Sequence, residues 1–67
     1  MISSTTYQLE GYRIIEYKGL VTALPMFKVA NSYKRLEEDA GKLGANAVIG
    51  IRYNDMWYGT AVVVKPV

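Results

Sequence analysis

Apolar residues follow two different spacings along this chain of 67 residues. Three segments, 12–22, 46–53 and 57–65, are rich in β-branched and aromatic residues and contain no proline, which is typical of β-strands. Between the first and second of these segments, apolar residues recur every three or four positions, which predicts an amphipathic helix. The pattern therefore predicts the order strand, helix, strand, strand.

The first predicted strand, YRIIEYKGLVT, carries apolar residues on both of its faces. Simple alternation gives one face with Arg13, Ile15, Tyr17 and Val21, and another with Tyr12, Ile14, Glu16, Lys18 and Leu20. Neither set is purely polar, so we expect both faces to be partly covered. Gly19 inside the strand suggests a bulge or the close approach of another backbone.

The helical spacing is carried by five residues, which are Val29, Tyr33, Leu36, Ala40 and Leu43. Two starts of the helix are compatible with the sequence. It begins near Met26 or Phe27, just after Pro25, or it begins later with Asn31-Ser32 as the N-cap. Gly44 follows the last periodic residue and is suited to the left-handed position that ends many helices.

The last two strands are almost wholly apolar. Alternation gives Ala47, Ile49, Ile51 and Tyr53 on one face of the first, with Val48, Gly50 and Arg52 on the other. In the second, Tyr58, Thr60, Val62 and Val64 oppose Trp57, Gly59, Ala61 and Val63. The link at 54–56, Asn-Asp-Met, contains turn formers, and it predicts a β-hairpin.

These elements predict a single domain over residues 1–67 of the α+β class. We expect a small two-layer structure, in which one helix covers one face of an antiparallel sheet. The polar segment at residues 2–8, ISSTTYQ, is compatible with a short edge strand or with a loose arm.

The apolar residues on both strand faces raise the question of what covers the second face, because strands of this kind are normally buried on both sides. One helix covers only one face, and a chain this short leaves no segment for the other, so the second cover must come from another copy. A 67-residue domain is also near the lower size limit for folding alone, and it has no cysteine for a disulfide. The sequence therefore predicts a homo-oligomer, which would also protect exposed strand edges.

Composition excludes several classes of function. The net charge is only +2, and the basic residues are scattered, so we expect no nucleic-acid partner. No apolar run is long enough to span a membrane, and the first ten residues lack a signal-peptide pattern, so we expect a cytoplasmic protein without membrane association. The chain contains no histidine or cysteine and no glycine-rich phosphate loop, so we do not expect an enzyme.

Three motifs resemble the YbjQ-like family. EGYRIIEYKGLV at residues 10–21 is similar to the opening strand of that family, and LGANAVIGIRY at 43–53 and GTAVVV at 59–64 are similar to its later segments. The matched segments cover more than half of the chain in the same order. The resemblance implies a fold like that of a dodecin subunit and assembly into a pentameric ring, in agreement with the predicted oligomer.

The family is labelled heavy-metal-binding, which makes metal one candidate ligand. A thiol site is excluded here by composition, and only carboxylates and carbonyls remain as donors for a hard cation. Glu16 and Asp55 are the candidate metal ligands, and ring symmetry could bring copies of one carboxylate together. Typical members also carry a long insertion between the first strand and the helix, which residues 22–31 replace here. The role of that insertion cannot be transferred.

A second candidate ligand is a planar aromatic molecule, by analogy with dodecins. Tyr17, Tyr53, Trp57 and Tyr58 are the candidate binding residues, because aromatic rings on strands can stack on such a ligand. The competing interpretation is that these rings fill subunit interfaces. A purely structural or interaction role for the oligomer is a third possibility. The sequence identifies no cofactor.

Overall fold

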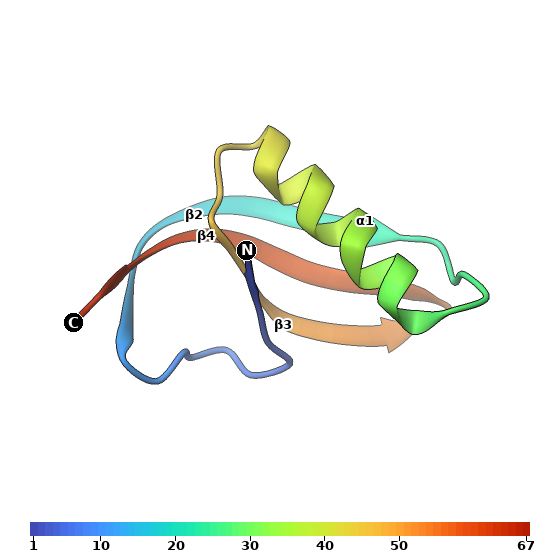
Figure 1. The fold of residues 1–67 in the computed structure, drawn as a ribbon, viewed down its shortest axis with the longest axis horizontal. Helices are drawn as coiled ribbons and strands as arrows, with labels where there is room; N and C mark the ends of the chain where they lie inside the picture. The colour runs from blue at the N-terminus through green and yellow to red at the C-terminus, as the bar shows by residue number, and fades with distance from the viewer.

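The helix and the three long strands form from the segments whose hydrophobic patterns predicted them. The computed structural model describes residues 1–67. The elements are β1 (Ile2–Ser3), β2 (Tyr12–Ala23), α1 (Val29–Lys42), β3 (Ala47–Asn54) and β4 (Met56–Pro66). Figure 1 shows the helix lying across one face of the sheet. The predicted α+β architecture, with strand, helix, strand, strand in order, is confirmed.

The sheet has four strands in the order β1-β3-β4-β2. The long strands are antiparallel as predicted, since β4 pairs with β2 on one side and with β3 on the other. The short β1 pairs in parallel with β3, which makes the sheet mixed. Consequently β2 forms one edge of the sheet, and only β4 contacts it through the ladder.

The helix starts between the two positions that the sequence left open. Its N-cap is Lys28, which provides no side-chain cap, and Pro25 lies in the preceding loop. The end of the helix agrees with the prediction, because Leu43 is the C-cap and Gly44 follows with φ +84°. Leu36 and Ala40 of the apolar stripe are buried, whereas Val29 and Leu43 at its two ends are exposed.

A bulge in β3 contradicts the predicted alternation of that strand. Gly50 has φ +61°, and the pairing with β4 shifts between Ile49 and Arg52. A bulge adds one residue to a strand, so every side chain beyond it changes face. The side chain of Ile51 therefore lies on the helix side of the sheet, on the opposite face from the side chain of Ile49.

Two register shifts also alter β2, one between Ile14 and Glu16 and one between Tyr17 and Gly19. Gly19 has φ +131°, so the predicted bulge at this glycine is confirmed. Tyr17 pairs with Val62, and Val21 pairs with Gly59. These two partners lie on opposite faces of β4, so the prediction that Tyr17 and Val21 share a face was wrong.

The core consists of two clusters, one on each face of the sheet. The helix-side cluster contains Val21, Ala23, Leu36, Ala40, Ala45, Val48, Ile51 and Ala61. The far-side cluster contains Ala47, Ile49, Val62 and Val64. The predicted alternation of β4 is confirmed, because Ala61 belongs to the first cluster and Val62 and Val64 belong to the second.

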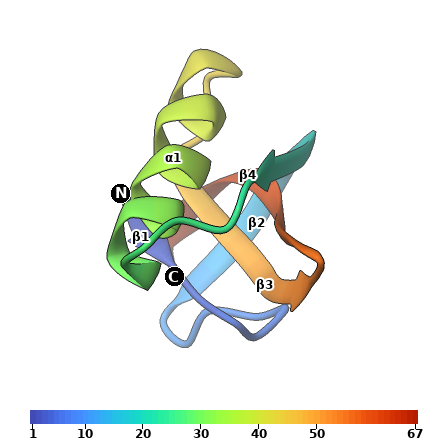
Figure 2. The same ribbon diagram turned by 90° about the vertical axis from the view of Figure 1, so that its right-hand side faces the viewer.

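Residues 1–9, here called the N-terminal arm, cover part of the far side. Ile2 and Leu9 pack against the far-side cluster, together with Ile14 of β2. Figure 2 shows β1 beside the helix and the blue loop that follows it lying away from the helix. The inference that the chain has no segment left for the second face was therefore wrong, and the need for a second copy is smaller than the sequence indicated.

Backbone hydrogen bonds hold the N-terminal arm along β3. Ser4 donates to the Val48 carbonyl at 2.9 Å, and Gly50 donates to the Thr6 carbonyl at 2.8 Å. The hydroxyl of Ser3 donates to Glu37 of the helix. The arm thereby closes most of the edge of the sheet that lies opposite β2.

No helix in the structure has the length and apolarity needed to cross a membrane.

Candidate functional site

Two of the four candidate aromatic residues lie side by side. The β3–β4 hairpin pairs Tyr53 with Trp57, and their ring centroids are 5.1 Å apart in an edge-on arrangement. Tyr33 of the helix contacts Trp57 from another side, with centroids 5.4 Å apart. Trp57 is half-buried and packs against the helix-side cluster, whereas Tyr53 is exposed. The structure thus forms a three-ring cluster of Tyr33, Trp57 and Tyr53.

The other two candidate aromatic residues lie away from this cluster, on the far side of the sheet. Tyr17 pairs with Val62, and Tyr58 pairs with Thr22 and Arg52. The Arg52 guanidinium lies over the Tyr58 ring, 5.5 Å from its centroid. That contact is a cation–π interaction, which occupies one face of the ring. The four predicted residues therefore do not form one site within a single chain.

The two candidate metal ligands also lie apart. Glu16 lies in β2, and Lys18 forms an ion pair with it at 2.9 Å. Asp55 forms the tip of the β3–β4 hairpin, where its φ is +62°. The structure contains no group of three or more histidine, cysteine, aspartate or glutamate residues that could hold a metal ion. Neither carboxylate therefore belongs to a group of three such ligands within the chain.

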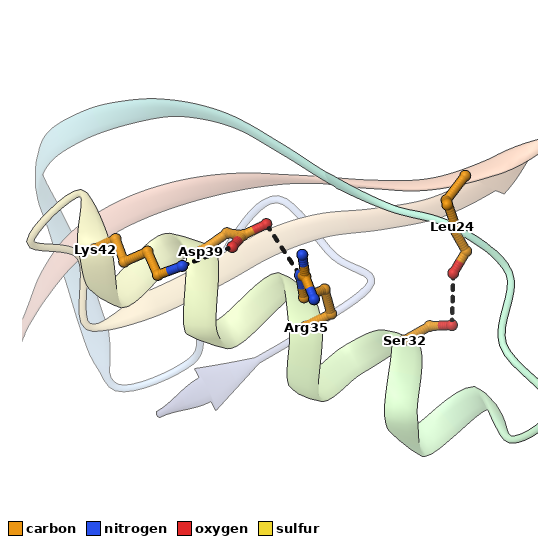
Figure 3. Close-up of polar contacts among 5 residues, drawn as sticks. All are labelled: Leu24, Ser32, Arg35, Asp39 and Lys42. Atoms are coloured by element: carbon orange, nitrogen blue, oxygen red, sulfur yellow. Dashed lines mark hydrogen bonds and ion pairs between the residues drawn. The ribbon is translucent and has the colours of Figure 1, made fainter.

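Two surface depressions are present, one at each end of the molecule. The larger, here called the arm groove, has a volume of about 830 Å³ and is lined by Ser4, Thr6, Gln8, Leu9, Glu10, Tyr12 and Ile14. The smaller, of about 320 Å³, is lined by Thr22, Ala23, Leu24, Met26, Arg35, Asp39 and Met56. Its helix wall carries ion pairs from Asp39 to Arg35 and Lys42, as Figure 3 shows.

The outer edge of β2 is an unpartnered surface. This strand is 12 residues long, and its outer edge is unpaired. Its far-side residues Tyr17 and Leu20 are 68% and 59% exposed. The pairing with β4 is regular over residues 19–23, so this half of the strand offers an uninterrupted edge. Long, exposed apolar edges are typical sites of strand pairing with another chain.

Two surface features were not predicted from the sequence, which are the contact of Tyr33 with Trp57 and the exposed apolar residues before the helix. Tyr33 was assigned only to the helix stripe, although a stripe residue necessarily faces the sheet where Trp57 lies. The sequence assigned residues 22–31 to the replacement of an insertion and left a helix start near Met26 or Phe27 open, and it did not single out the loop at residues 24–28. The structure places three exposed apolar residues in it, which are Leu24, Met26 and Phe27, and the exposed Val29 follows at the start of α1. The run of apolar residues around Pro25 was the available signal.

Comparison with known proteins identifies the family. No family model matches the chain. The UPF0145 protein MJ1170 of Methanocaldococcus jannaschii is 34% identical over 86 residues, covering 100% of this chain and 96% of the relative. The aligned region is longer than this chain, so the relative carries residues that this chain lacks. The chain belongs to the UPF0145 family, which is the YbjQ-like family that its motifs resemble.

Proposed function

We propose that this chain acts as a self-assembling module, whose copies form a ring and cover the exposed surface of β2. The observation that carries the proposal is the unpaired outer edge of β2, flanked by the exposed side chains of Tyr17 and Leu20. The opposite edge of the sheet is closed by the N-terminal arm, so the two edges differ sharply in protection. The pentameric ring that the family resemblance implies stays a prediction, as does the cytoplasmic location.

The proposal is tested by native mass spectrometry and sedimentation of the wild-type chain and of Leu20→Glu. The wild type is expected to be a multimer. Leu20→Glu is expected to shift it toward smaller species, because a charge in a buried interface carries a large desolvation cost. The circular dichroism spectrum should not change, since Leu20 is exposed within one chain. Val67→Glu, at an exposed position near the chain end, is the control.

Two results would contradict the proposal. One is a wild-type chain that stays monomeric at the highest concentration that remains soluble. The other is a Leu20→Glu variant that assembles as tightly as the wild type, which would place the interface elsewhere on the molecule.

A second candidate function is the binding of a planar aromatic ligand on the three-ring cluster. The observation that favours it is the exposed ring of Tyr53 beside Trp57, because aromatic rings with an open face can stack on such a ligand. Ion binding by carboxylates from several copies also stays a prediction, but no geometry within the chain favours it.

Native mass spectrometry tests the aromatic ligand directly, on protein purified without added ligands. The expected result is an added mass from a bound molecule, which also gives the solution a visible absorption band. Tyr53→Ser should remove both the added mass and the absorption band. Tyr58→Ser is the matched control, because it removes the same kind of ring from the opposite face. A wild-type mass without any bound molecule would count against this site. Equal loss of the bound molecule in Tyr53→Ser and Tyr58→Ser would also count against it.

A further inference from the structure

The loop between β2 and α1 presents an apolar surface that nothing in the chain covers. Residues 24–28, here called the apolar loop, include Leu24, Met26 and Phe27, all of them exposed, and the exposed Val29 follows as the first residue of α1. Phe27 has a relative exposure of 101%, so its whole ring faces solvent. Grouped apolar residues of this kind typically mark an interaction site.

The apolar loop is held in a defined conformation. Ser32 of the helix is fully buried, and its hydroxyl donates to the Leu24 carbonyl and accepts from the Met26 N–H, both at 3.2 Å. Figure 3 shows the bond between Ser32 and Leu24. Because these bonds fix the loop before any partner arrives, docking of the loop costs less conformational entropy.

A receiving surface lies at the opposite end of the molecule. The apolar residues that line the arm groove are Leu9 and Ile14, which pack against the far-side cluster, and the exposed Tyr12. In Figure 1 the light-blue turn that leads into β2 lies toward one end of the long axis, and the green loop before the helix lies at the other. The molecule is 36 Å long, so one chain cannot bring these two surfaces together.

The charges of the two surfaces are complementary. Glu10 is the one charged residue that lines the arm groove, and Lys28 is the one charged residue of the apolar loop. Both side chains are exposed, and neither belongs to the three ion pairs within the chain. A loop with apolar residues and one cation is therefore complementary in charge to a groove lined by one anion, three apolar residues and three neutral polar residues.

We infer that the apolar loop of one copy docks into the arm groove of a second copy, with Phe27 against Leu9 and Ile14 and with Lys28 beside Glu10. This inference rests on the proposed self-assembly and names its contact. Because the loop and the groove lie at opposite ends, the contact is head-to-tail. Such contacts close into a ring when the rotation between copies allows it, and otherwise they extend into a filament.

Charge reversal tests the inference through sedimentation of the full chain. Lys28→Glu and Glu10→Lys should each raise the dissociation constant by about threefold to tenfold, and the double variant should restore association toward that of the wild type. Phe27→Ser should raise it by about tenfold or more, because buried aromatic residues dominate interfaces. Lys34→Glu, an equal charge change on an exposed helix position, should leave it unchanged.

The outcomes separate this inference from the proposed function. If the wild type assembles but Phe27→Ser and both charge variants assemble equally well, the docking contact is wrong while self-assembly stands. If the double variant is weaker than either single variant, Lys28 and Glu10 do not pair, and the inference is overturned. If the wild type is a monomer, both fail together. Circular dichroism confirms that each variant is folded.

Discussion

Gly59 shows how a single hydrogen atom in place of a side chain permits the helix-side packing. The residue is buried in β4, and a Cβ atom added there would lie 2.5 Å from Cγ1 of Val48. Val48 is itself fully buried, so it has no free space into which to move. The close approach of the Val48 side chain to the backbone of β4 at this point therefore requires glycine.

Gly59→Ala is expected to lower the free energy of unfolding by about 1–3 kcal/mol, the usual cost of overpacking a core. Urea unfolding followed by circular dichroism measures this change. Gly41→Ala is the control, because a Cβ at Gly41 would meet only the Met1 side chain at 3.8 Å on an exposed helix position. That change should stabilise the chain by about 0.5–1 kcal/mol, and equal effects of both variants would contradict the packing argument.

At the scale of elements, the N-terminal arm is the part of the fold with the largest unexpected role. It contributes a short strand, backbone bonds to β3 and two apolar contacts to the far-side cluster. Tyr7 of the arm lies over Gly50, where an added Cβ would come within 2.5 Å of its ring. The arm and the bulge at Gly50 therefore fit each other, which explains why a glycine with positive φ is buried there.

Deletion of residues 1–9 is expected to lower the free energy of unfolding by about 2–4 kcal/mol, because it removes the burial of Ile2 and Leu9 and exposes the far-side cluster. Urea unfolding measures the loss, and binding of a hydrophobic dye reports the exposed surface. Thr5→Ala, which changes an exposed arm residue without a side-chain hydrogen bond, should be neutral. A deleted chain as stable as the wild type would mean that the arm is not a structural cover.

The elements were predictable where the spacing of apolar residues carried the information. The helix follows from its three- and four-residue intervals, its end follows from Gly44, and the pairing of Tyr53 with Trp57 follows from the hairpin. The bulges were harder, because an extra residue at Gly50 changes the face of Ile51 without changing composition. The role of the arm was hidden for another reason, since backbone atoms make most of its bonds and side chains do not reveal them.

The candidate site was less predictable than the fold. Four aromatic residues were grouped by residue type, but the register shifts in β2 and the alternation of β4 place Tyr17 and Tyr58 on the far side. Tyr33 joined the cluster only through the packing of helix on sheet. Which face a residue occupies after a bulge depends on tertiary pairing, and local sequence does not encode it strongly.

At the scale of the whole molecule, protection is distributed unevenly. One sheet face is covered by the helix, the other is partly covered by the arm, and one edge is closed while that of β2 is open. The exposed apolar residues gather along β2 and in the loop that directly follows it. This continuity means that a neighbouring copy could cover both with one interface, which supports the proposed assembly.

The strand order also affects the way in which the chain folds as it is made. β4 lies between β2 and β3, and Tyr12 near the start pairs with Pro66 near the end. Bringing such distant residues together costs loop-closure entropy and slows folding. During synthesis, β2 has no partner until the last strand has left the ribosome. We therefore expect the antiparallel part of the sheet to form in a late step, once β4 is available, whereas the helix and the β1–β3 pairing do not depend on β4.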